Sequence, residues 1–234
     1  MVLRIIPRID HWHPVVHPPT LSLGGLHLWR IPTGGRGGSL GRLWSLLSRQ
    51  ESERAGKLKL DHHRERYVRA HAGLRMILSG YLGAAPEIIG FCYGEAGKPR
   101  LAGPCSGLEF NLTTSGDLAL VALARGIPIG VDCEQVGDRG DVIAIARRMF
   151  SSEQASRIAA ADEEERLRRF HIAWTALEAE VKRDGRGLLG RDEPAARGVF
   201  SVRYFVPASG FIAAVACERL PPVGDWVTLS LGAD

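Results

Sequence analysis

The sequence predicts an α+β fold in which a single chain forms two similar halves. Helix and strand patterns of similar size occur on both sides of a short segment at 125–128 that contains a glycine and a proline. The chain has 234 residues, which suffices for one large domain or for two small ones packed together. Its 45% hydrophobic and 24% charged residues are typical of a globular protein. We therefore expect a first half at 1–126 and a second at 127–234, although no direct sequence repeat relates them.

The first half combines one early strand pattern, two helix patterns and two later strand patterns. In the longer helix, apolar residues such as Val68 and Leu74 recur at helical spacing, with arginines between them. A turn is expected at 113–116, between the two later strands. The expected elements lie at 21–31 (strand), 41–57 and 62–82 (helices), and 110–112 and 118–123 (strands).

The second half begins with a strand, continues with three helices and ends with two strands. The strongest helix pattern of the chain covers 163–184 and ends at Gly185, a residue that commonly terminates helices. The expected elements are a strand at 127–132, a helix at 142–150, a helix beginning at Ser152, the helix at 163–184, and strands at 199–205 and 211–217.

Composition restricts where the protein works and what it binds. No apolar run of about 18 residues occurs, and the N-terminus lacks a signal-peptide pattern, so neither a membrane span nor a membrane partner is expected. The four cysteines lie far apart, without paired metal-ligand spacing, which favours a reducing, cytoplasmic location. The net charge of +4 permits acidic partners, but a solvated basic surface is the better explanation of so modest an excess.

Two acidic residues lie on the strand that opens the second half. Asp132 and Glu134 are two positions apart, so both carboxylates point from one face, while Val131 and Cys133 point into the core. Two neighbouring carboxylates repel each other unless a positive group lies between them, and Mg²⁺ or Mn²⁺ meets that need with oxygen ligands. Taken alone, however, this common pattern is better explained by an exposed strand face.

The helix at 163–184 favours a functional site. Trp174, Glu178 and Lys182 are spaced four apart and therefore line one face of the helix. An acid and a base at this spacing usually form a surface ion pair of small energy. Because Trp174 should be substantially buried, we expect Glu178 and Lys182 to point toward the interior or a cleft.

Several ordered motifs together resemble the Sfp-type 4′-phosphopantetheinyl transferases. The resemblance covers roughly residues 48–190 and is specific, because the motifs occur in the family's order at compatible spacing. The motifs are Gly97-Lys-Pro, Phe110-Asn-Leu-Thr-Thr-Ser-Gly-Asp, Gly130-Val-Asp-Cys-Glu, Phe170-x-x-x-Trp174-Thr-x-x-Glu-Ala-x-x-Lys182 and Gly185-x-Gly-Leu. Members of this subfamily are monomeric pseudo-dimers of two α/β halves within one chain, and we expect the same here.

The resemblance implies a reaction and a metal site. Such enzymes transfer the 4′-phosphopantetheine arm of coenzyme A to a serine of an acyl or peptidyl carrier protein and release 3′,5′-ADP. By this similarity Asp132, Glu134 and Glu178 would hold Mg²⁺, with Mn²⁺ as a possible replacement. Glu178 would also take the serine proton, and Lys182 would neutralise charge on the phosphate under attack.

The resemblance also implies contacts to coenzyme A. Lys98 would reach it from the Gly-Lys-Pro turn, and basic residues of the first helices would face its phosphates. For these basic residues a solvated surface charge is an equally good interpretation. The expected contacts are Arg54, Lys57, Arg66 and Lys98, together with Thr113, Thr114 and Ser115.

Two positions depart from the family pattern. Thr114 replaces the usual histidine, which would contact a coenzyme A phosphate, and Leu177 replaces a usual lysine beside Glu178. Each lost charge-assisted bond would weaken binding by about 1.5–3 kcal/mol. These changes place coenzyme A affinity, rather than the metal ligands, in question.

Three functions therefore remain open. The first is an active transferase, and the second is a non-catalytic or specialised relative that binds a carrier protein or coenzyme A without efficient transfer. The third is a nucleic-acid-binding module that uses the basic helices. No zinc ligands or aromatic-rich strand motif supports the third, so no nucleic-acid partner is expected.

Overall fold

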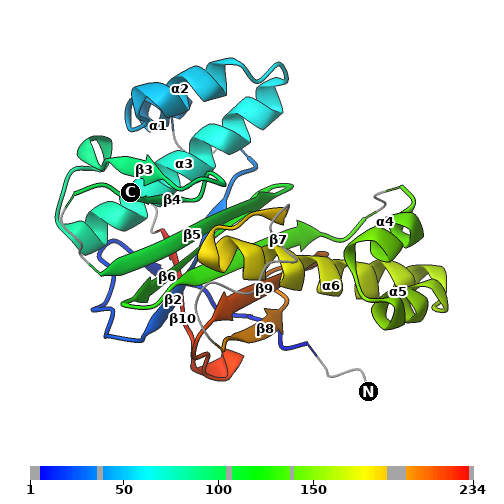
Figure 1. Ribbon diagram of the computed structural model, residues 1–234. Coiled ribbons are helices and arrows are strands. Elements are labelled where there is room, and N and C mark those ends of the chain that lie inside the picture. The colour runs from blue at the N-terminus through cyan, green and yellow to red at the C-terminus, as the bar shows by residue number, and fades with distance from the viewer. Residues whose placement is uncertain (1–5, 36–38, 104–106, 138–139, 189–198, 232–234) are drawn as a thin grey trace.

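The computed structural model describes residues 6–35, 39–103, 107–137, 140–188 and 199–231 (Figure 1). Among the described residues, runs of strands and runs of helices follow one another along the chain, which confirms the α+β class. The elements up to residue 125 are β1 (His13–Val15), β2 (Leu26–Pro32), α1 (Leu40–Ser45), α2 (Arg49–Gly56), α3 (Asp61–Leu82), β3 (Phe91–Tyr93), β4 (Pro99–Leu101), β5 (Leu108–Ser115) and β6 (Leu118–Arg125). The later elements are β7 (Ile129–Gln135), α4 (Val142–Met149), α5 (Ser152–Ala159), α6 (Glu163–Asp184), β8 (Ser201–Phe205), β9 (Phe211–Cys217) and β10 (Val227–Leu231).

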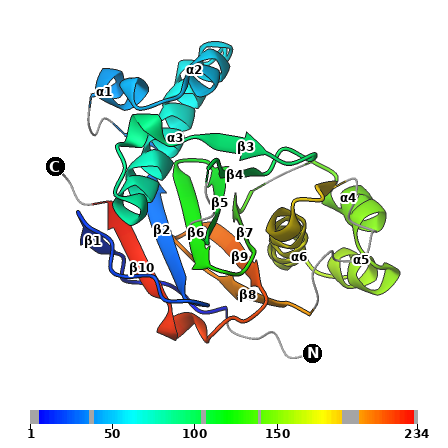
Figure 2. The ribbon, with the colours of Figure 1, turned by 60° about the vertical axis from the view of Figure 1, so that its left-hand side comes forward.

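A five-stranded sheet with the order β1-β10-β2-β6-β5 forms the centre of the first part of the molecule. Strand β6 is antiparallel to both β2 and β5, whereas β10 runs parallel to β2. The buried side of α3, including Leu74 and Leu78, packs on this sheet against residues such as Trp29 and Val121. The short hairpin of β3 and β4 lies between α3 and β5 (Figure 2).

A three-stranded sheet with the order β7-β9-β8 supports α6. The helix lies directly on β7, because a side chain at Gly130 would collide with the backbone of Ala179 and Arg183. Small residues continue this close packing, since Ala179 contacts Ala214 and Ala216 of β9. Gly130 therefore sets how near α6 comes to β7.

Strands β5 and β7 lie side by side, yet among the described residues they belong to different sheets. Side chains of β5 take the place of a backbone ladder: Asn111 Oδ1 accepts from the Val131 amide at 2.8 Å, and Ser115 Oγ accepts from the Gln135 amide at 2.9 Å. The two sheets also share one apolar core, to which Leu120 and Val131 both contribute. Polar side chains of β5 are thereby held against β7.

The expected boundaries of the long helix 163–184 and of the strand 211–217 are confirmed, and the helix expected at 62–82 begins one residue earlier. The single helix expected at 41–57 is wrong, because the chain forms two helices there. Ser48 caps α2, accepting from the Glu51 amide while the Glu51 side chain accepts from the Ser48 amide. This capping box starts a new helix after α1.

Several strand ends also differ from expectation. Strand β5 continues to Ser115, which moves the expected turn at 113–116 to Gly116–Asp117. Strand β7 begins at Ile129 and not at 127, β2 begins at Leu26 and not at 21, and β8 begins at Ser201 and not at 199.

The C-terminal strand returns to the first sheet, where β10 pairs with β1 and β2. The division into 1–126 and 127–234 stays a prediction, and this pairing argues against grouping residues 227–231 with the second half. None of the helices formed by the described residues is long and apolar enough to cross a membrane. Cys92, Cys133 and Cys217 carry free thiols, and Cys105 lies outside the described residues.

Candidate functional site

Asp132 and Glu134 project from one face of β7, as their spacing predicted. Val131 and Cys133, which point the other way, belong to the buried core. Only 2% of the Asp132 surface is exposed, whereas Glu134 is half-buried near the end of the strand. The pattern is therefore not an exposed strand face.

The two oxygens of Asp132 have different surroundings. Oδ1 is 2.6 Å from Lys182 Nζ and accepts a hydrogen bond from the Thr113 hydroxyl at 3.1 Å. Oδ2 is buried without a hydrogen-bond partner. An unsatisfied carboxylate oxygen in the interior is costly unless a cation or donor reaches it, so Oδ2 is a candidate ligand.

Burial and neighbouring charges shift the titration of this pair. Burial raises the pKa of Asp132 to about 6, and Glu134 and Glu178 add to that rise, while Lys182 opposes it. Burial by itself would lower the pKa of Lys182, but the charge and hydrogen bond of Asp132, together with the charges of Glu178 and Glu134, raise it. Lys182 therefore stays charged beside the carboxylate.

Helix α6 brings Glu178 and Lys182 to β7. Lys182 Nζ lies 3.7 Å from Glu178 Oε2, and the Glu178 side chain is only 16% exposed. One turn earlier, Trp174 stacks on the buried Phe170 with ring centroids 5.9 Å apart. Trp174 itself is partly rather than fully buried, but the expectation that Glu178 and Lys182 lie inward is confirmed.

The three consecutive residues of β5 divide between two faces. Thr113 donates to Asp132, and Ser115 donates to Glu134 Oε2 at 2.9 Å. Thr114, on the opposite face, is exposed. Thr113 and Ser115 thus contact the predicted metal ligands directly, whereas Thr114 is available to solvent.

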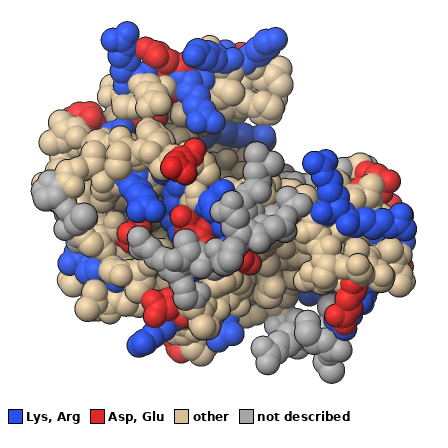
Figure 3. Space-filling view, viewed as in Figure 1, with Lys and Arg blue, Asp and Glu red and all other residues tan. Residues whose placement is uncertain are grey.

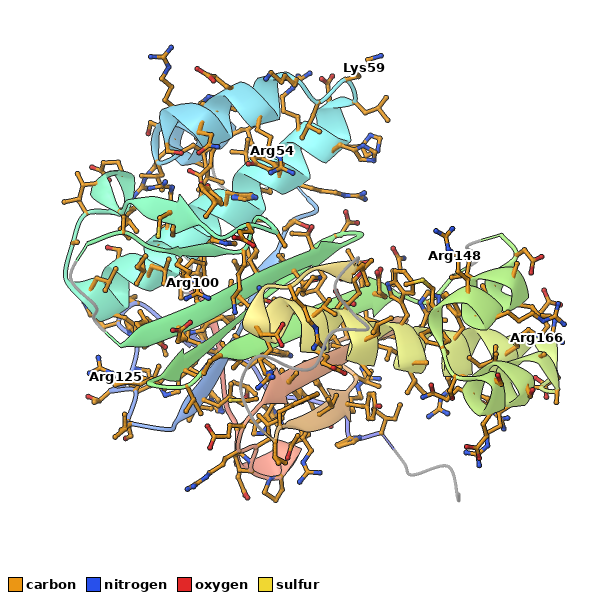
Figure 4. The ribbon with its side chains drawn as sticks, in the orientation of Figure 1. Arg54, Lys59, Arg100, Arg125, Arg148 and Arg166 are labelled. Atoms are coloured by element: carbon orange, nitrogen blue, oxygen red, sulfur yellow. The ribbon has the colours of Figure 1, made fainter. Side chains whose placement is uncertain are left out.

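The basic residues of the first helices lie on a different part of the molecule. Arg54, on α2, and Lys57, at its C-terminal end, are both exposed, and Figure 4 shows Arg54 above the α3 ribbon. Arg66 of α3 is already paired, with its guanidinium 2.6 Å from Asp117 in the β5–β6 turn. Figure 3 shows basic side chains gathered over the α1–α3 region and again over α4 and α5.

Lys98 is buried and does not lie exposed on the surface. It precedes β4 and donates to two backbone carbonyls, those of Ile129 at 3.0 Å and Arg183 at 2.6 Å. A pocket of about 220 Å³ adjoins it. The pocket is lined by Ala96, Gly97, Lys98, Pro99, Asn111, Leu112, Val181, Lys182, Gly185 and Gly187.

The acidic side chains do not converge as a finished metal centre. Within the part of the chain that the structure describes, no three His, Cys, Asp or Glu side chains lie close enough together to hold a metal ion. The Lys182 ammonium contacts both Asp132 and Glu178 instead. The chemistry of the donors nonetheless suits a hard cation, because Asp132 Oδ2 is an unsatisfied carboxylate oxygen and the charges of Glu134 and Glu178 act on the same carboxyl group.

Two residues that were not predicted for the site contact its members or their neighbours in the chain. Asn111 holds the Val131 amide beside Asp132, and Asp117 holds Arg66. Asn111 could have been found from the sequence, because it alternates with Thr113 and Ser115 and so shares their face of β5. Nothing local to the sequence indicated the pairing of Asp117 with Arg66.

The amino-acid sequence is similar to proteins of one family. The family model described as the 4′-phosphopantetheinyl transferase superfamily matches residues 128–205, which contain β7 and α6. The 4′-phosphopantetheinyl transferase HetI of Nostoc sp. is 34% identical over 221 residues, covering 88% of this chain and 92% of that protein.

Two further relatives match shorter regions. The 4′-phosphopantetheinyl transferase AcpT of Escherichia coli is 38% identical over 122 residues, covering 52% of this chain and 58% of that protein. The 4′-phosphopantetheinyl transferase Sfp of Bacillus subtilis is 28% identical over 150 residues, covering 63% of this chain and 64% of that protein. The likeness to HetI extends over nearly the whole of both chains, so this chain belongs to the 4′-phosphopantetheinyl transferase superfamily.

Proposed function

We propose that this protein transfers the 4′-phosphopantetheine arm of coenzyme A to a serine of an acyl or peptidyl carrier protein and releases 3′,5′-ADP. The observation that carries the proposal is the buried Asp132, which lies against Lys182 and retains one unsatisfied oxygen. Family membership supports this reaction, and the contact of Asp132 with Lys182 supports its proposed location.

Glu178 and Lys182 have the proposed catalytic roles. Glu178 takes the proton from the attacking serine hydroxyl, as a general base must. Lys182 is held charged by Asp132 and contributes positive charge to the phosphate under attack. The serine oxygen forms the new bond to phosphorus, and the bond from that phosphorus to the ADP oxygen breaks.

Mg²⁺ is the proposed cofactor, with Mn²⁺ as a substitute. Asp132, Glu134 and Glu178 would hold it, and Asp132 Oδ2 is the oxygen that most clearly needs a cation. When bound, the metal neutralises negative charge on the diphosphate. Thr113 and Ser115 orient the carboxylates of Asp132 and Glu134 by hydrogen bonding.

Coenzyme A is proposed to lie between the pocket beside Lys182 and the basic residues of the first helices. The pocket of about 220 Å³ has Lys182 in its wall, which connects it with the carboxylate cluster. Arg54, Lys57 and Arg66 would then face the nucleotide phosphates. Arg66 would have to leave or share its pairing with Asp117.

A carrier protein is the proposed partner, and α4 offers a surface for it. Arg147 and Arg148 are exposed in the last turn of α4, near the N-terminal part of α6. Carrier proteins of this reaction present an acidic helix beside the serine, which such a basic surface would attract. The free thiols of Cys92, Cys133 and Cys217 support action in a reducing cytoplasm, and a monomer is expected.

A pseudo-dimer of two related halves is also proposed. Helices α3 and α6 each contain 22 residues, and each is followed by a glycine in the left-handed conformation, Gly83 and Gly185. Each helix packs on one of the two sheets. This shared plan supports a common ancestry of the halves.

Weighing a panel of apo carrier proteins after incubation tests the proposal. We expect at least one carrier to gain one phosphopantetheine arm when coenzyme A and Mg²⁺ are present. A chelator should stop the reaction, and added Mg²⁺ should restore it. If no carrier gains mass while coenzyme A still binds, the chain is instead a binding relative without efficient transfer.

A further inference from the structure

Lys98 occupies an unusual position for a lysine. Only 8% of its surface is exposed, and its side chain runs from the β3–β4 hairpin across to the other sheet. Its aliphatic part passes close to Gly185, where a Cβ would lie 3.2 Å from the lysine side chain. Burying an ammonium is costly unless strong acceptors receive it.

Two backbone carbonyls accept hydrogen bonds from the Lys98 ammonium, one from β7 and one from α6. The Ile129 carbonyl belongs to the first residue of β7, and the Arg183 carbonyl belongs to the last turn of α6. Carbonyls in the last turn of a helix have no partner within the helix, and the C-terminal end of a helix attracts positive charge. The Lys98 ammonium therefore supplies a hydrogen-bond donor for the Arg183 carbonyl and a positive charge at the C-terminal end of α6.

These same two elements carry the proposed active site. Asp132 is three residues after Ile129 on β7, and Lys182 immediately precedes Arg183 on α6. The contact between Lys182 and Asp132 measures 2.6 Å, so a small shift of α6 along β7 would break it. Gly130 permits the close approach of the two elements, but a glycine cannot hold them in register.

We propose that Lys98 is a positioning residue, which holds the end of α6 against the start of β7 and thereby keeps Lys182 and Glu178 beside Asp132. The proposal rests on the proposed function for its catalytic consequence. It differs from a direct contact between the Lys98 ammonium and coenzyme A, because two of the three N–H groups are already used within the protein.

The charges around Lys98 are compatible with such a clamp, by which the Lys98 ammonium holds the end of α6 against the start of β7. Burial lowers the pKa of Lys98 to about 8, which leaves the ammonium charged at neutral pH. The other charged groups acting on it are Glu109, Arg100, Asp184 and Arg183. The Lys98 ammonium thus makes two charge-assisted bonds under ordinary conditions.

Lys98→Met provides the test, because it keeps an unbranched apolar side chain as far as Cε and removes the ammonium with its donors and its charge. Lys98→Arg restores donors, and Arg125→Met removes an exposed cation at the end of β6, far from α6 (Figure 4). For each variant, kcat and KM for coenzyme A are measured with a carrier that the unchanged protein modifies. Amide hydrogen exchange is followed in parallel at Gly185, whose amide donates to the Val181 carbonyl at 3.0 Å.

We expect Lys98→Met to lower kcat at least about tenfold with less than about a threefold change in KM, and to speed exchange at Gly185. Lys98→Arg should recover part of both losses, and Arg125→Met should change neither. A large rise in KM with kcat retained would overturn the proposal in favour of a substrate contact. Unchanged kcat and exchange in Lys98→Met would overturn it as well.

The exchange measurement separates this proposal from the proposed function. If the unchanged protein modifies no carrier, the transferase assignment fails, but faster exchange at Gly185 in Lys98→Met would still support the clamp. If transfer occurs normally and Lys98→Met behaves like Arg125→Met in both measurements, the clamp alone is wrong.

Discussion

Glu51 and Asp132 are both buried acids, yet their surroundings are opposite. Both oxygens of Glu51 are engaged: Oε2 accepts from Arg75 at 2.7 Å and from the Ser48 amide at 2.8 Å, and Oε1 lies 3.4 Å from His71 Nδ1. At Asp132, Lys182 and Thr113 share Oδ1 and leave Oδ2 unpaired. The first carboxylate is fully satisfied by the protein and the second is not.

The pKa values follow this difference. Burial would raise the pKa of Glu51, but the bonds from His71 and Ser48 and the charge of Arg75 outweigh it and lower the pKa to about 2. At Asp132 burial prevails, and the pKa rises to about 6. A satisfied buried acid ties helices together, whereas an unsatisfied one marks a place where a cation or substrate group can bind.

The largest expected effect concerns transfer at the unsatisfied site. Glu178→Ala removes the proposed base and metal ligand, so kcat should fall by about 10²–10⁴-fold. The fold should survive, because the side chain contacts only the neighbouring Lys182 at 3.7 Å in the described ion pairs. Carrier mass and thermal melting measure the two effects. Activity close to that of the unchanged protein would contradict the role of Glu178.

Substitution of Glu51, the fully hydrogen-bonded acid, should lower stability and leave transfer intact. Glu51→Gln leaves Arg75 buried without its charge partner and should cost about 3 kcal/mol of unfolding free energy, which lowers the melting temperature by about 6–12 °C. Transfer below the melting temperature should persist. Glu53→Gln is the matched control, since that side chain is 56% exposed and its loss should cost at most about 0.5 kcal/mol. Equal melting temperatures of the two variants would show that the Glu51 cluster stabilises nothing.

Acidic pH should lower the free energy of unfolding through protonation of Glu51. Its folded pKa of about 2 lies below the ordinary 4.5, so its stabilising effect is complete above about pH 4.5 and is lost as the pH falls toward 2. Between pH 5 and pH 3 this amounts to about 2 kcal/mol. Urea unfolding at both values should show a loss in the unchanged protein that is smaller in Glu51→Gln. An equal loss in both would contradict the assignment.

The smallest effect concerns the departure from the family pattern at Thr114. This residue is exposed, so Thr114→His should not disturb the fold. An added histidine should lower KM for coenzyme A by up to about tenfold or leave it unchanged. Thr114→Ala serves as the control for loss of the hydroxyl. A clear rise in KM in Thr114→His would show that the nucleotide lies differently in this chain.

Local patterns predicted the parts of the structure that local forces determine. Helix α6 begins after Asp162, which caps it, and ends at Gly185, so both ends could be read correctly. The shared face of Asp132 and Glu134 followed from strand geometry. The capping box of Ser48 and Glu51 was also present in the sequence, and overlooking it led to one helix where there are two.

Contacts between distant segments could not be predicted in this way. The pairing of β10 with β1 and β2 joins the two ends of the chain, and no local pattern specifies it. The Lys98 ammonium donates to the carbonyls of Ile129 and Arg183, which lie 31 and 85 residues away in sequence. Such contacts depend on how the sheets pack together.

The most direct test of the account is transfer by Asp132→Asn, followed by the mass of an apo carrier protein with coenzyme A and Mg²⁺ present. Asparagine preserves the shape of the side chain and can still accept from Thr113 and Lys182, but Lys182 loses its nearest charge partner, so the melting temperature should fall as in Glu51→Gln, and transfer is measured below it. The account predicts no gain of a phosphopantetheine arm by Asp132→Asn, while Glu51→Gln still modifies the carrier below its lower melting temperature. Modification of the carrier by Asp132→Asn at the rate of the unchanged protein would contradict it.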